Sequence, residues 1–170
     1  MHGKKTVSID VAFEPPTLRL RSATPGDLDF LRSWKNAHRQ FFFHQAEIST
    51  EQQRSWFDAF VQRPHDYMLM VEHQGTAIGC MGIRLLESEW DVYNVILGDA
   101  AYGKRGFMGC AFAAMLTMAR QERALPITLK VLKHNPAVGW YLKNGFAISF
   151  EAQDHFGLHC QASTKKDTPA

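Results

Sequence analysis

Apolar and polar positions alternate with two different periods along this chain, and each change of period marks the boundary of a predicted element. Apolar residues spaced three and four apart predict helices that begin near Thr24, near Thr50, after Gly106 and at Pro136. Alternation of period two is typical of half-buried strands. It predicts strands over residues 17–22, 67–72, 76–85, 90–97, 127–132, 146–151 and 155–162.

Polar residues at the predicted helix ends support these boundaries. Thr24 is followed by Asp27, and Thr50 by Gln53, which is the spacing of a capping box. Gly145 ends the last helix in the manner of a glycine C-cap. Antiparallel neighbours mixed with strand–helix–strand crossovers predict an α/β (α+β) fold. We expect a central mixed, mostly antiparallel sheet of about seven strands, with helices on both faces.

The chain of 170 residues is long enough for one domain with a full hydrophobic core. We place this domain at residues 17–162. Residues 1–16 are predicted to form a flexible N-terminal arm, and residues 163–170, which are polar, a frayed C-terminal tail.

Composition narrows the classes of partner. The net charge of +2 comes from 19 basic and 17 acidic residues that are scattered, whereas nucleic-acid surfaces cluster their basic residues. Cys80, Cys110 and Cys160 form no C-x-x-C pair and are interpreted as reduced thiols. The sequence has no apolar span long enough for a bilayer and no signal peptide at its start. We therefore expect a cytoplasmic protein that binds neither nucleic acid nor membrane.

The segment from Leu97 to Gly109 leaves a strand, contains several glycines and two adjacent cations, and opens a long helix. Free N–H groups and the positive dipole end of a helix favour phosphate. An ordinary turn with solvated cations explains the same residues. Gly103-Lys104 nearly completes a nucleotide P-loop, but Arg105 stands where Mg²⁺ binding needs Ser or Thr. The segment also lacks the G-x-G-x-x-G pattern of dinucleotide folds.

Within this segment, Lys104-Arg105-Gly106-Phe107-Met108 resembles the coenzyme A signature of the GNAT superfamily of N-acetyltransferases. The match is to the branch of ribosomal-protein alanine acetyltransferases, with its x-G-K-G-Y-M loop. Gly103 departs from the wider R-x-x-G-x-G/A pattern, and so does Met108. The resemblance implies acetyl-CoA as co-substrate and no metal. It also implies a pyrophosphate held by Gly103, Lys104, Arg105, Gly106, Phe107, Met108 and Gly109.

A second segment, residues 135–146, resembles another element of the same superfamily. Asn135, Ala137, Tyr141, Gly145 and Phe146 match its N-x-x-A-x-x-x-Y-x-x-x-G-F pattern in the short variant that begins N-P-A. The resemblance implies that Tyr141 acts as general acid toward the departing thiolate, and that Asn135 binds the pantetheine arm. Two alternatives stay open: Tyr141 as a helix residue with its hydroxyl in water, and Asn135 as a helix cap.

In this superfamily the pantetheine arm lies along a splayed strand, here represented by Val95, Ile96 and Leu97. A fully paired core strand is the alternative. The acceptor amine must also lose a proton before it attacks. Asp91 and His44 are the candidate bases, although a solvated surface group is the better explanation of each.

The first seventy residues bear on the acceptor. Trp34-Lys35-Asn36, residues 48–52 and Trp56-Phe57 resemble the branch that acetylates nucleotide-linked amino sugars and protein N-termini. We expect transfer of acetyl from acetyl-CoA directly to an amine: an amino sugar, a peptide N-terminus or another small amine. A non-catalytic acyl-CoA-binding regulatory module is the alternative, and the sequence leaves open whether the chain forms a homodimer.

Overall fold

The computed structural model describes residues 4–11, 13 and 18–161. The predicted tail over residues 163–170 lies outside the described part, as do residues 1–3, 12 and 14–16 of the predicted arm. Within that arm the structure differs from the expectation, because β1 (Ser8–Val11) pairs antiparallel with β2 (Leu18–Ser22). Val7 and Val11 are buried in the core, which anchors this short strand at the sheet edge.

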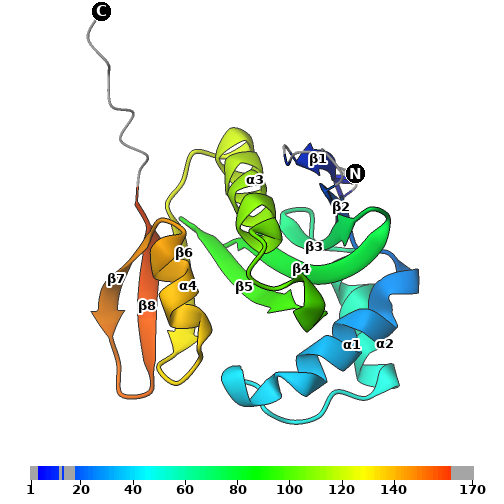
Figure 1. The fold of residues 1–170 in the computed structure, drawn as a ribbon, viewed down its shortest axis with the longest axis horizontal. Helices are drawn as coiled ribbons and strands as arrows, with labels where there is room; N and C mark the ends of the chain where they lie inside the picture. The colour runs from blue at the N-terminus through cyan, green and yellow to red at the C-terminus, as the bar shows by residue number, and fades with distance from the viewer. Residues whose placement is uncertain (1–3, 12, 14–17, 162–170) are drawn as a thin grey trace, which may run out of the picture.

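One sheet of eight strands organises the molecule, in the order β1-β2-β3-β4-β5-β6-β8-β7 (Figure 1). All neighbours are antiparallel except the parallel pair β5 and β6. The prediction of a mixed, mostly antiparallel sheet is confirmed, and β1 is the additional strand. The remaining strands are β3 (Asp66–His73), β4 (Thr76–Leu85), β5 (Trp90–Leu97), β6 (Ile127–Leu132), β7 (Phe146–Glu151) and β8 (His155–Cys160).

Over the part of the chain that the structure describes, four α-helices cover the two faces of the sheet (Figure 1). Helices α1 (Leu28–Ala37) and α2 (Thr50–Phe60) pack on one face. Helices α3 (Phe107–Glu122) and α4 (Ala137–Lys143) pack on the other. Within the described ranges, no helix combines the length and apolar character needed to cross a membrane.

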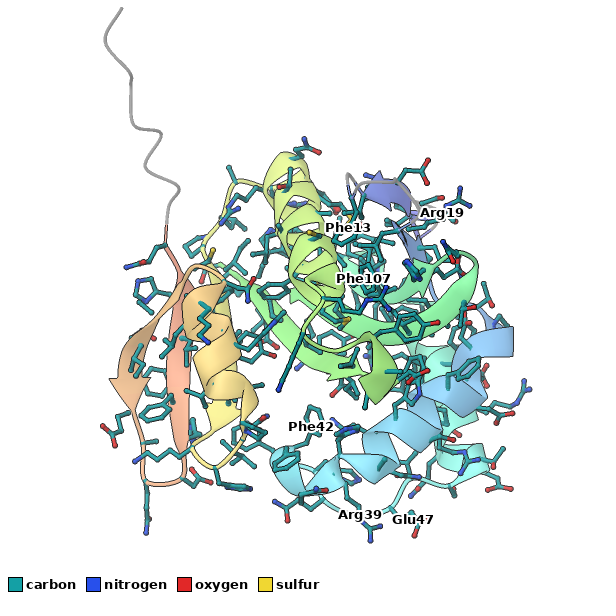
Figure 2. All side chains as sticks on the ribbon, viewed as in Figure 1. Phe13, Arg19, Arg39, Phe42, Glu47 and Phe107 are labelled. Atoms are coloured by element: carbon teal, nitrogen blue, oxygen red, sulfur yellow. The ribbon has the colours of Figure 1, made fainter. Side chains whose placement is uncertain are left out.

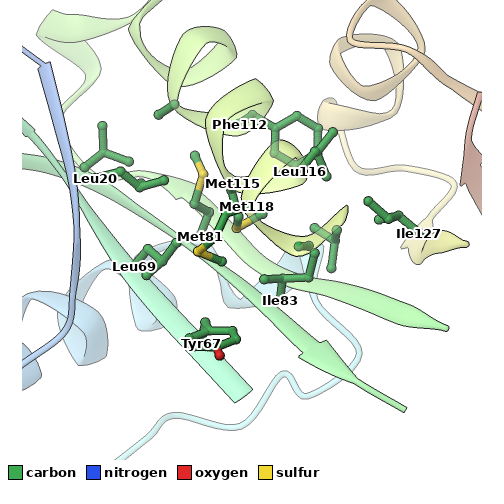
Figure 3. Close-up of a cluster of buried hydrophobic side chains, with 14 of the residues drawn as sticks. Leu20, Tyr67, Leu69, Met81, Ile83, Phe112, Met115, Leu116, Met118 and Ile127 are labelled. Atoms are coloured by element: carbon green, nitrogen blue, oxygen red, sulfur yellow. The ribbon is translucent and has the colours of Figure 1, made fainter. Parts of the chain in front are cut away.

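Strand alternation divides the core into two clusters. Leu69 faces α3, where it joins Met81, Met115 and Phe112 in the larger cluster (Figure 3). Its neighbours Met68 and Met70 face the opposite side and join the cluster under α1 and α2. All of these side chains are at most 2% exposed. Because β3 is buried on both faces, its side chains fix the sheet between two helical layers.

The capping residues follow the sequence pattern with one correction. Asp27 accepts a hydrogen bond from the Thr24 amide at 2.8 Å, as the spacing predicts. The second helix is capped by Ser49 instead of Thr50, and its amide donates to Gln52 at 2.9 Å. Ser49 and Thr50 each have a glutamine three residues later, so the pattern alone does not distinguish the two registers.

The central pair of strands separates soon after it begins. β5 and β6 pair only at Trp90 with Ile127 and at Asp91 with Thr128. The register between β4 and β5 shifts between Cys80 and Gly82, opposite Asn94, whose φ is +48°. Beyond Asp91 the main chain of β5 has no strand neighbour on the β6 side among the described residues. The splayed strand expected from the sequence is thus present, and the fully paired alternative is excluded.

Candidate functional site

A cavity of about 460 Å³ occupies the opening between β5 and α4. Four segments meet there: the end of α1 with the turn that follows it, the second half of β5, the loop leading into α3, and the start of α4. The structure brings most of the predicted site residues together in this cavity: Val95, Ile96, Leu97, Gly103, Lys104, Gly106, Phe107, Met108, Gly109, Asn135 and Tyr141.

The loop into α3 presents main-chain amides to this cavity. Lys104 and Gly106 have positive φ angles of 58° and 80°, and Gly106 is the N-cap of α3. The first hydrogen bond at the start of α3 runs from the Cys110 amide to the Gly106 carbonyl at 3.0 Å. Among the described residues, the amides of residues 104–109 have no recorded main-chain partner. A helix N-terminus with free donors favours a bound phosphate.

Aromatic packing fixes the first turn of α3. The Phe107 ring lies 4.4 Å from His73 and 4.7 Å from Phe13, measured between ring centroids (Figure 2). The guanidinium of Arg105 lies 4.7 Å from the centroid of the same ring, outside the lining of the cavity. Of the predicted pyrophosphate residues, Arg105 is the one that does not line the cavity.

Tyr141 extends from α4 into a buried position beside the cavity. Its side chain packs against Phe112, Trp140 and Phe146, and only 7% of the residue is exposed. Within the described residues its hydroxyl makes no recorded hydrogen bond. Burial raises the pKa of Tyr141 well above its usual range. The phenol thus carries its proton at neutral pH and can donate a hydrogen bond or a proton into the cavity.

The loop before α4 caps the helix and binds the α1–α2 connection. The carboxamide oxygen of Asn135 accepts from the Ala137 amide at 2.8 Å, which is the capping alternative. Its nitrogen donates to the Phe41 carbonyl at 3.3 Å, and His134 Nε2 donates to the Gln40 carbonyl at 2.8 Å. These two contacts hold the turn that carries Phe41 and Phe42 over the cavity.

Neither predicted base lies in this cavity. Asp91 lines neither this cavity nor the second cavity described below, and it pairs with Arg84 at 2.9 Å. Burial raises the pKa of the Asp91 carboxyl, and Arg84 partly offsets this effect. His44 is exposed and lines a second, neighbouring cavity.

His38 is the titratable side chain that the sequence analysis missed. It lines the main cavity, and its Nδ1 lies 2.9 Å from the Trp34 carbonyl oxygen. Because a carbonyl only accepts, Nδ1 carries the proton, and the neutral imidazole keeps its lone pair on Nε2. Its position one turn after Trp34 is the only sequence signal for this contact, since an i to i−4 carbonyl lies within reach of a side chain at a helix end.

The second cavity, of about 270 Å³, lies between α1, α2 and the sheet. Lys35 lines it, with its Nζ 3.4 Å from the centroid of the Phe42 ring and in hydrogen-bond contact with Asn94 Oδ1. Burial lowers the pKa of Lys35 to about 8. Trp56 also lines this cavity and stacks on Phe60 at 4.8 Å, so the indole serves the core as well as the cavity wall.

Comparison with known proteins gives one family and one fold. A sequence model of the acetyltransferase (GNAT) domain matches residues 17–147. No curated protein matches the sequence.

Among the described residues, no cluster of three or more His, Cys, Asp or Glu side chains gathers in a metal-binding arrangement.

Several solved N-acetyltransferase structures share the fold. Spermidine N-acetyltransferase from Vibrio cholerae, in complex with CoA and spermine, is 20% identical with a TM-score of 0.73, over 84% of this chain and 94% of that one. RimL, a ribosomal L7/L12 alpha-N-protein acetyltransferase in complex with coenzyme A, is 17% identical with a TM-score of 0.72, over 91% and 97%. PaiA N-acetyltransferase from Thermoplasma acidophilum, in complex with coenzyme A, is 16% identical with a TM-score of 0.67, over 85% and 99%.

Proposed function

The chain belongs to the GNAT acetyltransferase family, and from this premise we propose how its cavity transfers acetyl from acetyl-CoA to a small-molecule or peptide amine. One observation carries the proposal. The amide-rich loop before α3, the unpaired edge of β5 and the Tyr141 side chain all line a single cavity. This arrangement matches the three parts of the co-substrate: pyrophosphate, pantetheine arm and thioester.

The pyrophosphate is held by the main-chain amides of residues 104–109, with Lys104 adding charge at the same end of the cavity. The pantetheine amides pair with the free edge of Val95, Ile96 and Leu97, as an added strand pairs with a sheet. Met108 packs close to Gly79, which brings the first turn of α3 onto the sheet. The thioester then lies at the Tyr141 end of the cavity.

Transfer follows from these positions. The amine nitrogen attacks the thioester carbon, and a β5 amide stabilises the resulting oxyanion. The C–S bond then breaks, and Tyr141 donates its proton to the departing thiolate. His38 Nε2 takes the proton that the attacking nitrogen releases. We choose His38 over His44 and Asp91 because it alone of the three lines this cavity. The products are an acetamide and coenzyme A.

The test combines binding and turnover in one set of samples. Calorimetry with acetyl-CoA measures co-substrate binding, and thiol release with amino sugars, peptides and polyamines measures transfer. Binding accompanied by amine-dependent thiol release supports the proposal. Binding without thiol release from any amine would instead favour a regulatory acyl-CoA-binding module, and absence of binding would remove the site altogether.

A further inference from the structure

The second cavity adjoins the first along β5. Ile96 lines both cavities. Phe42 lines the first, and its ring lies directly against the ammonium of Lys35, which lines the second. Figure 2 shows Phe42 between α4 and α1, next to β5 in this view. A molecule in the second cavity would therefore share Ile96 as a contact with a molecule in the first cavity.

The lining of the second cavity includes a basic side chain and, among the described residues, no acidic one. Its polar lining residues are a lysine, a histidine and three neutral amides, and no Asp or Glu lines it among the described residues: Lys35, His44, Gln52, Gln53 and Asn94. A cavity that held a polyamine would need carboxylates to balance the additional ammonium groups. This lining instead offers hydrogen bonds and one positive charge.

Lys35 lacks the partner that a half-buried ammonium needs. None of the ion pairs among the described residues includes it. Its ammonium contacts only the Asn94 carboxamide oxygen and the face of Phe42. Removing an ammonium from water without an anion is unfavourable, and a bound carboxylate or phosphate would offset that cost. Cys80, which lies near it, does not fill this role, because burial raises the pKa of this thiol to about 12.

We propose that the second cavity binds the acceptor, and that the acceptor is an amine carrying an anionic group, a carboxylate or a phosphate, that pairs with Lys35. This inference rests on the proposed acetyl transfer, since the amine of the bound acceptor must face the thioester beside Ile96. Gln52, Gln53 and Asn94 supply donors and acceptors for the neutral part of the molecule, and Trp56 supplies an apolar wall. Polycationic amines are excluded by the same lining.

Matched acceptors test the inference by thiol release at saturating acetyl-CoA. Glucosamine 6-phosphate is compared with glucosamine, a free amino acid with its methyl ester, and spermidine serves as the polycation. We expect kcat/KM to be at least tenfold higher for the anionic member of one pair than for its counterpart without the anionic group. The pair that shows this difference identifies the anionic group as phosphate or as carboxylate. Lys35→Met should bring that ratio close to one, and Lys35→Arg should keep part of it. Lys130→Met, an exposed lysine outside both cavities, is the control.

The inference would be overturned by equal use of both members of each pair, by preference for spermidine, or by an anion preference that survives in Lys35→Met. Loss of thiol release with every acceptor in Lys35→Met, with acetyl-CoA affinity intact, would also overturn it, because Lys35 would then serve proton transfer instead of recognition. Failure of the proposed acetyl transfer looks different: wild-type protein would release no thiol with any amine.

Discussion

Tyr141 combines two properties that a proton donor needs, since it is buried beside the cavity and its hydroxyl has no recorded partner within the described residues. We expect Tyr141→Phe to lower kcat by roughly 100-fold, within the usual range for loss of a general acid. The KM for acetyl-CoA and the stability should change little, because the lost hydroxyl supports no hydrogen bond in the fold. Steady-state kinetics and thermal melting measure both effects.

Tyr67→Phe provides the opposite case for comparison. The Tyr67 hydroxyl donates to Glu122 at 2.7 Å in a buried position outside both cavities. Its loss should reduce the free energy of unfolding by about 1 kcal/mol and leave kcat unchanged. Wild-type kcat in Tyr141→Phe would show that another group protonates the thiolate.

Lys35 is a half-buried ammonium whose charge lowers the stability of the fold. Burial lowers its pKa from 10.5 to about 8, so between these values the folded protein binds fewer protons than the unfolded chain. The free energy of unfolding therefore rises with pH across this window. We expect Lys35→Met to be more stable than wild type at pH 7 by on the order of 1–2 kcal/mol, a figure reduced for partial solvation.

The difference should shrink as the pH rises from 7 to 10, because wild-type Lys35 becomes neutral in the folded state. Denaturant unfolding at several pH values measures it. Two other titratable side chains, His44 and Cys80, line the same cavity as Lys35. The fit of unfolding free energy against pH must therefore include both. A stability difference that does not vary with pH would contradict the assignment to Lys35 ionisation.

At the scale of elements, the loop into α3 depends on a backbone shape that glycine adopts without strain. Gly106 has φ of +80° at the N-cap of α3. Gly106→Ala introduces about 1 kcal/mol of strain and shifts the amides that follow. We expect the KM for acetyl-CoA to rise about tenfold, comparable to losing one hydrogen bond to a charged group, with kcat nearly unchanged. Steady-state kinetics at saturating acceptor measure this change.

Gly75→Ala is the matched control. Gly75 has φ of +78° in the exposed β3–β4 turn, outside both cavities, with no atom within 4 Å of an added Cβ. Gly75→Ala should lower the free energy of unfolding by a similar amount and leave the KM for acetyl-CoA unchanged. If both variants raise KM equally, the effect is global destabilisation and does not come from the loop.

Local patterns predicted the elements well, because side-chain periodicity is a property of short stretches of chain. Residues 90–97, 127–132 and 146–151 are strands with the predicted bounds. β1 was missed because four residues carry little periodicity, and its position depends on pairing with β2. The cap of α2 was displaced by one residue because two equivalent boxes overlap at Ser49 and Thr50.

The site was predictable only where a motif places several residues in one local shape. The loop before α3 and the segment from Asn135 to Tyr141 are of this kind, and both line the cavity. The base depends on distances between elements distant in sequence, so the sequence offered Asp91 and His44 on residue type alone. Asp91 pairs with Arg84 outside the cavity, and the contact between His38 and the Trp34 carbonyl becomes visible only in the fold.

At the scale of the whole molecule, the eight strands form two groups that share only the short β5–β6 pairing. The cavity lies where these groups separate, and its walls come from β5 and from α4, the helix that connects β6 to β7. Coenzyme A bound along β5 would therefore connect the two groups and stabilise the protein against unfolding. At 100 times its Kd the gain is about 2.7 kcal/mol, which for a chain of this size raises Tm by about 5–10 °C.

Thermal melting with coenzyme A measures this shift, and hydrogen exchange locates it. Exchange should slow at the amides of residues 95–97 and of the loop over residues 104–109, while amides far from both segments gain protection only through global stability. ATP with Mg²⁺ is the control for a general polyphosphate effect, because Arg105 stands where a triphosphate loop needs a hydroxyl. An equal shift in Tm with ATP would mean that the loop binds phosphate and that the rest of the cavity contributes nothing. Unchanged exchange at residues 95–97 would mean that the pantetheine arm does not lie along β5.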